Sequence, residues 1–426
     1  MIYVENERKD IKYQVEHGYK LYTLIHYVNK ETLKEQHKRQ QKNKASGIDK
    51  MTKDKYEENL DSNIDNLIVR MKNFSYKPLP VRRTFIPKGN GKLRPLGIPA
   101  YEDKLVQGVM TNILNEIYEC KFLNCSYGFR PNRSCHQAIN KINQRLMINK
   151  VNYVLECDIK GFFDNVDHKW LMKFLENDIQ DKNFLRYINR FLISGYMEEM
   201  KYYETDKGTP QGGLISPILA NVYLHYVLDL YFEKYIKPRL KGEAYLVRYA
   251  DDFIIMFQYE NEAKQVYELL NKRLAKFSLE MEQEKTRILP FGRFKGTKET
   301  FDFLGFMHYN GTTRTGKYTI GHKMNKKKRK LKQKAITKWI KEHRTTKFIE
   351  IIKLLNKKLI GLYAYYGING MLNELYKLYY HTLYALRSSI FRRSQRRLSV
   401  KVFNKILKRV PIVEPKIYKD IWCWNI

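Results

Sequence analysis

The stretch that most constrains the fold is an adjacent pair of acids, Asp251 and Asp252, set inside the largely apolar segment Leu246 to Phe257. Apolar runs of this kind predict strands, and two charged residues between them predict the tight turn that joins the strands. An isolated Asp-Asp pair is equally typical of an ordinary solvated turn. The pair alone therefore leaves its chemistry open.

A third acid, Asp158, falls at the end of another predicted strand, Tyr153 to Ile159. Three acids that converge at one sheet end repel each other unless a cation neutralises them, and their hard oxygen ligands suit Mg²⁺. Two such ions about 4 Å apart would activate an attacking hydroxyl and stabilise a departing pyrophosphate. The arrangement therefore points to nucleotidyl-transfer chemistry.

Composition narrows the class of protein. The 426 residues carry 79 Lys and Arg against 45 Asp and Glu, a formal net charge of +34, and 43% of them are hydrophobic. The apolar content excludes a wholly disordered chain, and so basic a surface favours a nucleic-acid partner over the alternative of charge that merely aids solubility. The five cysteines form no CxxC pair, and the start of the chain lacks the pattern of a signal peptide. We expect a cytoplasmic protein without a membrane span.

The order of elements predicts an α+β fold with antiparallel strands. A hairpin is expected from Val81 to Pro99, around the Asn-Gly signal, and helices from Gly213 to Tyr235 and from Glu260 to Phe277. Residues 6–44 look helical and basic.

Positive charge concentrates near the C-terminus, with 12 Lys or Arg against one acid from Lys323 to Lys347 and nine against none from Arg387 to Arg409. Between these stretches, seven tyrosines from Tyr363 to Tyr384 lie in an apolar, helix-like segment. Tyrosines of this kind could stack on bases, but at helical spacing they are more often core, which we favour.

With Tyr249 and Ala250 before the acid pair, and Asp158 93 positions earlier, the chain resembles reverse transcriptases. More specifically, it resembles the group II intron-encoded reverse transcriptases of bacteria. The strings that carry the likeness are GIDKMT (47–52), IPKGNGKLRPLGIP (86–99), SYGFRPNRSCHQAI (126–139), GTPQGGLISPILANVYL (208–224) and LGF (304–306). They occur in the family's order over roughly residues 45 to 310.

The resemblance implies a right-hand polymerase of fingers, palm and thumb. It places a basic N-terminal extension at residues 1–45, fingers and palm at 46–310, and a helical thumb or maturase-like domain at 311–426. Two Mg²⁺ ions, with Mn²⁺ as a substitute, would be held by Asp158, Asp251, Asp252 and the Ile159 carbonyl. Lys285 matches the position of a candidate general acid for the leaving pyrophosphate, although an ordinary solvated lysine is an equally good interpretation.

The remaining assignments concern nucleotide and nucleic acid. Lys88 and Arg94 match residues that grip the incoming triphosphate, and Gln211 lines the nucleotide pocket; an exposed basic hairpin is the alternative for the first two. Phe163 matches the side chain that crowds a ribose 2′-hydroxyl and so favours deoxynucleotides. The template and primer contacts implied are Arg130, Tyr249, Leu304, Gly305 and Phe306.

The function expected is RNA-directed DNA synthesis by an intron-encoded protein that binds and helps to splice its intron RNA. Its partners would be a structured RNA, an RNA template, a DNA primer or product, and dNTPs. The match is thinner past residue 310, where Gly361-Leu362 stands in place of the family's frequent Gly-Trp, and no endonuclease Cys pair or His-Asn-His arrangement follows. An alternative is a domesticated group II-like reverse transcriptase, in antiphage defence or beside a CRISPR system, with a dedicated noncoding RNA.

Overall fold

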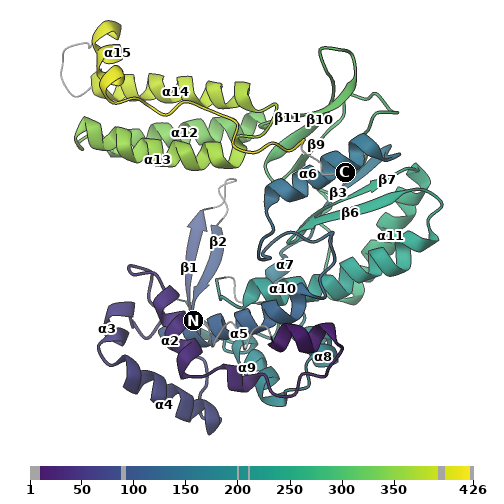
Figure 1. Cartoon of the computed structure of the whole chain (residues 1–426), viewed down its shortest axis with the longest axis vertical. Helices are drawn as coiled ribbons and strands as arrows, with labels where there is room; N and C mark the ends of the chain where they lie inside the picture. Colours follow the sequence, from purple (N-terminus) through teal and green to yellow (C-terminus); the bar gives the residue numbers. More distant parts are fainter. Residues whose placement is uncertain (1–9, 88–92, 199–200, 210–211, 392–398, 423–426) are drawn as a thin grey trace.

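The computed structural model describes the chain except residues 1–9, 88–92, 199–200, 210–211, 392–398 and 423–426. In the described part, helices surround three separate sheets in an α+β architecture, as the sequence predicted (Figure 1). In Figure 1 a two-stranded hairpin lies below the C-terminal helices, and the central sheet lies to one side of both. The hairpin belongs to the fingers, the C-terminal helices form the thumb, and the central sheet is the palm.

The central sheet, or palm, is antiparallel throughout and has the strand order β6-β7-β3-β8. Its strands are β3 (Tyr153–Asp158), β6 (Ala244–Tyr249), β7 (Asp252–Phe257) and β8 (Arg287–Pro290). The two strands predicted from the acid-bearing segments are thereby confirmed, and the Leu246 to Phe257 segment divides at the acid pair.

Both faces of the palm sheet are covered, which explains why β7 is apolar at every position after its first. Phe253 and Ile255 join the core on one face with helix α11 (Glu260–Lys276), whereas Ile254 joins the core on the other with α6 (Cys135–Ile148). Successive strand residues point to opposite faces, so only a sheet covered on both sides buries such a run.

The fingers sheet has the order β2-β1-β4-β5. Its strands are β1 (Val81–Pro87), β2 (Leu93–Ile98), β4 (Tyr196–Glu198) and β5 (Lys201–Tyr203). The predicted hairpin is confirmed by the antiparallel pairing of β1 with β2, and its connecting residues 88–92 lie outside the described residues. The accompanying helices are α2 (Lys30–Arg39), α3 (Lys53–Glu57), α4 (Leu60–Lys72) and α5 (Tyr101–Glu119).

The N-terminal segment shares the main core. Ile11, Leu24 and Leu33 are all buried in the same cluster as α5 and the palm strands. Burying apolar side chains against the rest of the molecule stabilises the segment's position.

Further helices connect fingers and palm. They are α7 (Phe162–Asn165), α8 (His168–Asp178), α9 (Lys182–Leu192) and α10 (Ser216–Leu224), with short 3₁₀ turns at Ile25–Tyr27 and Lys237–Arg239. The helix predicted from Gly213 starts only at Ser216, with Pro217 in its first turn, and continues as π-helix over His225–Asp229 and Tyr231–Ile236. Proline fits a first turn because its missing N–H has no partner there.

The thumb follows a three-stranded sheet of β9 (Thr300–Phe303), β10 (Phe306–Thr312) and β11 (Tyr318–Lys323). Its helices are α12 (Lys326–Glu342), α13 (Phe348–Tyr366), α14 (Leu372–Phe391) and α15 (Val400–Arg409). None of the described helices is long and apolar enough to cross a membrane.

The seven tyrosines divide between core and surface. Tyr363 and Tyr366 are buried in the thumb core, as favoured from the sequence. Tyr380 and Tyr384 are 62% and 71% exposed, so for these two the prediction of core was wrong. They lie on the side of α14 opposite its buried residues. The apolar sequence around them predicted a helix but did not show which side of that helix faces solvent.

Candidate active site

The acid pair lies at the turn between β6 and β7. Tyr249 pairs with Asp252 across the two strands, so Ala250 and Asp251 form a two-residue turn. Asp252 is also the cross-strand partner of Asp158 on β3. The fold thus brings all three predicted acids to one end of the palm sheet, because two separate strand pairings meet there.

Burial makes this end of the sheet unfavourable for uncompensated negative charge. Burial, followed by the charges of Asp158 and Asp251, raises the pKa of Asp252 to about 8. The pKa of Asp251 is also raised, mainly by burial and then by Asp158, while Arg94 and Lys285 oppose that rise. The cluster therefore favours a proton or a cation.

Lys285 supplies one such cation. Its ammonium forms an ion pair with Asp158, in a turn whose Glu282 amide donates to the Asp158 carbonyl at 2.8 Å. The pairing raises the pKa of Lys285. Lys285 thus contacts a predicted metal ligand directly, a contact that the sequence did not indicate.

The donor set fits a hard divalent cation, because its carboxylate oxygens already attract an ammonium group. Among the described residues, however, no group of three or more His, Cys, Asp and Glu side chains is arranged to hold a metal ion. The acids share one end of the sheet without forming a preassembled metal centre. Ile159, the predicted backbone ligand, is buried and makes a β-bridge with Met281.

The predicted primer hairpin borders the same site. A cavity of about 510 Å³ is lined by Asp158, Asp252 and Lys285 together with Leu304 and Gly305. Leu304 and Gly305 form the two-residue turn between β9 and β10, both with positive φ (49° and 85°).

The thumb holds this hairpin turn in place. The Tyr365 hydroxyl donates to the Leu304 carbonyl at 2.8 Å, and Phe306 is fully buried against Tyr365 and Tyr366. A methyl group added at Gly305 would lie 3.1 Å from the Tyr366 hydroxyl oxygen. Phe306 therefore packs under the thumb, whereas Leu304 and Gly305 line the cavity together with Asp302 of β9.

On the fingers side, Arg94 is an exposed residue of β2 whose charge acts on Asp251. Arg94 therefore lies close enough to Asp251 for its charge to lower the pKa of that carboxyl. Lys88 and Gln211 lie outside the described residues.

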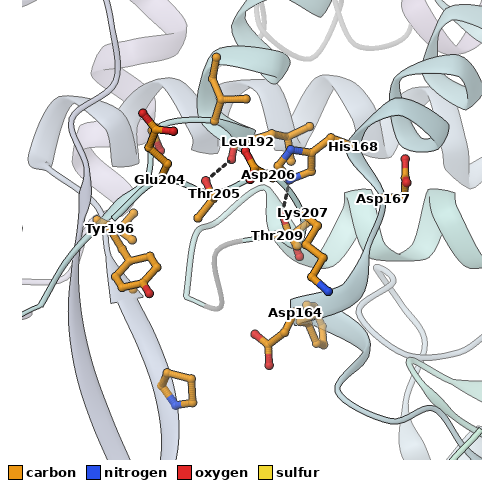
Figure 2. Close-up of a pocket in the computed structure, with 18 of the residues that line it drawn as sticks. Asp164, Asp167, His168, Leu192, Tyr196, Glu204, Thr205, Asp206, Lys207 and Thr209 are labelled. Atoms are coloured by element: carbon orange, nitrogen blue, oxygen red, sulfur yellow. Dashed lines mark hydrogen bonds between the residues drawn. The ribbon is translucent and has the colours of Figure 1, made fainter. Parts of the chain in front are cut away.

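Phe163 belongs to α7, next to a second cavity of about 990 Å³ between fingers and palm (Figure 2). Its backbone carbonyl accepts a hydrogen bond from the Thr209 amide at 2.7 Å, and the His168 ring contacts the Gly208 carbonyl at 2.6 Å. The Gly-Thr start of the GTPQGG string is therefore fastened to the helix that carries Phe163. The sequence did not indicate this cavity or the charged side chains in its wall, which include Asp164, Asp167, Glu204, Asp206 and Lys207.

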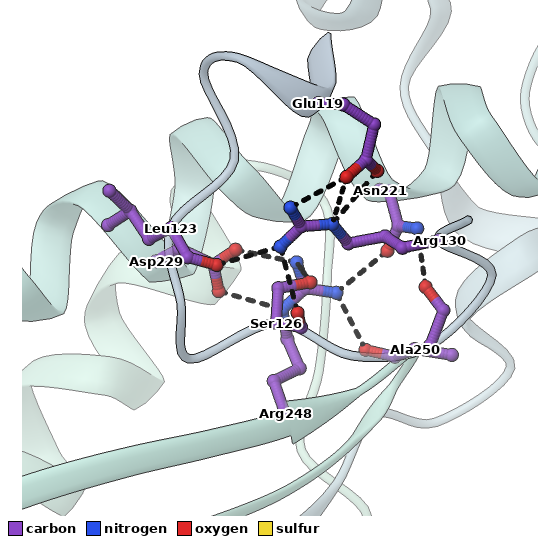
Figure 3. A network of polar contacts seen from close by, with 9 residues as sticks. Glu119, Leu123, Ser126, Arg130, Asn221, Asp229, Arg248 and Ala250 are labelled. Atoms are coloured by element: carbon purple, nitrogen blue, oxygen red, sulfur yellow. Dashed lines mark hydrogen bonds and ion pairs between the residues drawn. The ribbon is translucent and has the colours of Figure 1, made fainter. Parts of the chain in front are cut away.

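A buried polar network supports the acid-bearing turn (Figure 3). Arg248, fully buried on β6, donates to both carboxylate oxygens of Asp229, at 2.7 and 2.5 Å, to Asn221 Oδ1 at 3.0 Å and to Ser126 Oγ at 2.8 Å. Its Nη1 also donates to the carbonyl oxygen of Ala250 at 3.1 Å. Ala250 has a φ of 57°, a left-handed conformation that costs a non-glycine residue about 1 kcal/mol.

A neighbouring loop completes this network. A methyl group at Gly128 would lie 2.4 Å from the Ala250 nitrogen, and Asn221 Nδ2 donates to the Gly128 carbonyl at 2.7 Å. Arg130, expected to contact the template, is buried at 6% exposure and binds Glu119 together with the Leu123 and Ser126 carbonyls. The structure therefore places its guanidinium in the interior, because Glu119 offers it a carboxylate there. Tyr249 is partly buried beside the palm core.

The sequence does carry one signal for this network. Arg248 interrupts an apolar strand, and a buried guanidinium requires acceptors. The partner Asp229 could not be identified without the fold, because it lies 19 residues earlier in a π-helical turn.

Comparison with known proteins identifies the class. The chain belongs to the family described as reverse transcriptase (RNA-dependent DNA polymerase), whose model matches residues 86–308. Within that family it is similar to group II intron-encoded proteins, as its motifs predicted.

It is 34% identical to the group II intron-encoded protein LtrA of Lactococcus lactis subsp. cremoris over 388 residues, which covers 73% of this chain and 64% of LtrA. The putative COX1/OXI3 intron 1 protein of Saccharomyces cerevisiae is 34% identical over 263 residues, 50% of this chain and 31% of that protein. The chain therefore spans less than two thirds of the length of either relative. Neither relative supports the alternative of host defence.

A telomerase structure from Candida albicans, in complex with the TWJ fragment of telomeric RNA, aligns with a TM-score of 0.44 at 14% identity. The alignment covers 84% of this chain and 66% of that chain. The fold assignment rests on the family match and on the palm sheet itself.

Proposed function

We propose that this protein is an RNA-directed DNA polymerase of the group II intron type, which copies an RNA template into cDNA. The observation that carries the proposal is the cross-strand pairing of Asp158 with Asp252, one residue from Asp251, at a cavity that the Leu304-Gly305 turn also lines. Template-directed nucleotidyl transfer requires acids that can hold metal ions, and the Leu304-Gly305 turn beside them would support the primer.

Asp158, Asp251 and Asp252, with the Ile159 carbonyl, would hold two Mg²⁺ ions, for which Mn²⁺ can substitute. Such ions make the primer 3′-hydroxyl a better nucleophile and neutralise charge on the pyrophosphate that leaves when the phosphodiester bond forms. Burial and then the charges of Asp158 and Asp251 raise the pKa of Asp252, and both favour cation binding, since a cation removes the cost of ionising that carboxyl.

The other residues would act on substrate. Arg94 would bind phosphate oxygens of the dNTP, because its positive charge already acts on Asp251. Lys285, when a cation replaces it at Asp158, would be free to donate a proton to the leaving pyrophosphate. Phe163 would crowd a ribose 2′-hydroxyl and so select dNTPs.

Binding of a structured intron RNA is the second part of the proposal. Residues 326–409 contain 24 Lys and Arg against three acids, Glu342, Glu350 and Glu374. A unit this basic binds phosphate backbones with release of counterions. A role in splicing is proposed from the similarity to intron-encoded proteins, with bacterial cytoplasm as the place of action.

The direct test measures dNTP incorporation on a primed RNA in Mg²⁺. The double variant Asp251→Asn/Asp252→Asn should lose at least about 10³-fold in rate, because neutral amides cannot replace charged ligands. Glu268→Gln, which removes an exposed acid of α11, should retain full activity. Incorporation that survives in the double variant would show that the metal assignment is wrong.

A further inference from the structure

Two exposed tyrosines lie one helical turn apart on α14. Tyr380 and Tyr384 are 62% and 71% exposed, and the Tyr376 ring stacks on that of Tyr380, with centroids 6.0 Å apart. The opposite side of the helix, with Leu378 and Leu386, is buried in the thumb core. The tyrosines therefore present ring faces to solvent from a well-packed helix.

A lysine-lined groove runs between α12 and α14. Its cavity of about 430 Å³ is lined by Lys330, Lys334, Lys338 and Lys341, with Gln333, Thr337 and His381. The lysines recur every three or four residues and so share one side of α12. Within the described part of the chain, only Lys338 of these four has an acidic partner, Glu342 at 3.7 Å.

His381 connects the groove to the tyrosines. Its ring contacts the Thr337 hydroxyl of α12 at 2.9 Å, and it directly follows Tyr380 in α14. Beyond the tyrosines, α15 adds four exposed basic residues and no acid, namely Lys401, Lys405, Lys408 and Arg409. A cationic track beside exposed rings is the combination that binds single-stranded nucleic acid, with phosphates along the charges and bases on the rings.

We propose that the α12–α14 groove, with Tyr380 and Tyr384, binds an unpaired stretch of the RNA partner. The inference rests on the proposed RNA-binding function and names the form of RNA that this surface recognises. The groove lysines and both tyrosines line neither the cavity at Asp158 nor the one at Phe163. In Figure 1, α14 lies on the far side of α13 from the fingers hairpin. The surface is thus separate from the site of synthesis.

The charge of this surface favours RNA over a protein partner. An apolar docking partner would need a face without several unpaired ammonium groups, because burying them is costly. A phosphate backbone instead neutralises the lysines, and flat bases match exposed rings.

The test uses the full chain with its cleft occupied by a saturating blunt-ended primer–template duplex, which has no unpaired stretch to compete for the groove. Binding of a fluorescent 12-nucleotide oligoadenylate and of a 12-base-pair RNA duplex is measured by anisotropy over a range of KCl. The wild type should bind the single strand more tightly than the duplex. Tyr380→Leu/Tyr384→Leu should weaken single-strand binding by about 30-fold or more, with an unchanged salt slope.

Matched variants separate rings from charge. Tyr380→Phe/Tyr384→Phe keeps the rings and should bind as the wild type does. Lys334→Gln/Lys338→Gln should reduce the salt slope by about 1.4, the value for two single-strand phosphates. Tyr235→Leu/Tyr259→Leu removes two other exposed rings, each 48% exposed, and should change nothing.

Two results would overturn the inference. One is oligoadenylate binding that the leucine pair leaves intact; the other is self-association in sedimentation that the leucine pair abolishes while RNA affinity stays the same. Failure of the wild type to incorporate dNTPs, with oligoadenylate binding as expected, would instead reject the polymerase and support the surface.

Discussion

The guanidinium of Arg248 donates to the carbonyl oxygen of Ala250, two residues further along the chain, from a fully buried position. The same side chain neutralises Asp229. Arg248 thus has two roles: it holds Ala250, the left-handed residue that precedes the acid pair, and it balances the buried charge of Asp229. The two roles can be separated by mutation.

Arg248→Met should destabilise the protein by about 3–5 kcal/mol, because it leaves the Asp229 charge buried and unpaired. Arg248→Met/Asp229→Leu should recover most of that stability but not polymerase activity, since the Ala250 carbonyl still lacks its donor. Urea unfolding and primer extension measure the two effects. A stable double variant with full activity would show that the turn needs no support from Arg248.

Phe163→Ala should raise ribonucleotide incorporation relative to deoxynucleotide incorporation by about tenfold or more, because space opens at the ribose. The comparison is Phe129→Ala, an exposed neighbour whose ring centroid lies 6.3 Å from that of Phe163. Competition between labelled rNTP and dNTP on one primed template gives the ratio. An unchanged ratio in Phe163→Ala would remove its selecting role.

Metal binding should depend on pH through Asp252. Its pKa of about 8 lies above the ordinary value, so between about pH 4 and 8 the folded protein holds a proton that the unfolded chain has released. Without metal, the free energy of unfolding therefore falls as pH rises through that window. Below pH 8, a divalent ion must displace the proton from Asp252. The affinity for the ion should therefore fall about tenfold for each unit by which the pH decreases.

Mn²⁺ affinity, followed by electron paramagnetic resonance, and thermal unfolding in EDTA test both statements. Asp252→Asn should remove this pH dependence of stability. Burial also raises the pKa of Asp103, to about 6, so a smaller fall at lower pH should persist in that variant. Mn²⁺ affinity that is the same at pH 6 and pH 8 would contradict the prediction.

The bracing of the primer hairpin by the thumb predicts a contrast between two tyrosines of α13. Tyr365→Phe removes the hydrogen bond to the Leu304 carbonyl and should cost about 1 kcal/mol and weaken primer binding. Tyr363→Phe should be neutral or stabilising, because the buried Tyr363 hydroxyl has no hydrogen-bond partner among the described residues. Equal effects of the two changes on primer affinity would dismiss the brace.

The sequence predicted the elements whose patterns are local. The strand-turn-strand around Asp251, the β1–β2 hairpin and helix α11 follow from apolar spacing and turn residues. The juxtaposition of Asp158 with that turn was expected from the family motifs.

Other features depend on packing between distant segments. Arg130 was expected to contact the template, and its ion pair with Glu119 could not be predicted, because an arginine in a loop string says nothing of a carboxylate in the preceding helix. Tyr363 and Tyr380 are the same residue type in similar sequence surroundings, yet Tyr363 is buried and Tyr380 is exposed. The difference depends only on which side of its helix packs against the rest of the thumb.

Because β7 is buried on both faces, the protein should not tolerate the insertion or deletion of a residue in this strand. A shift of one residue between β7 and β3 would exchange the faces of Phe253 and Ile254 and separate Asp252 from Asp158. The turn at Gly316, where a methyl group would meet nothing within 4 Å, has no such restriction. Among homologous genes, insertions and deletions should therefore accumulate between β10 and β11 and be absent from β3 and β7.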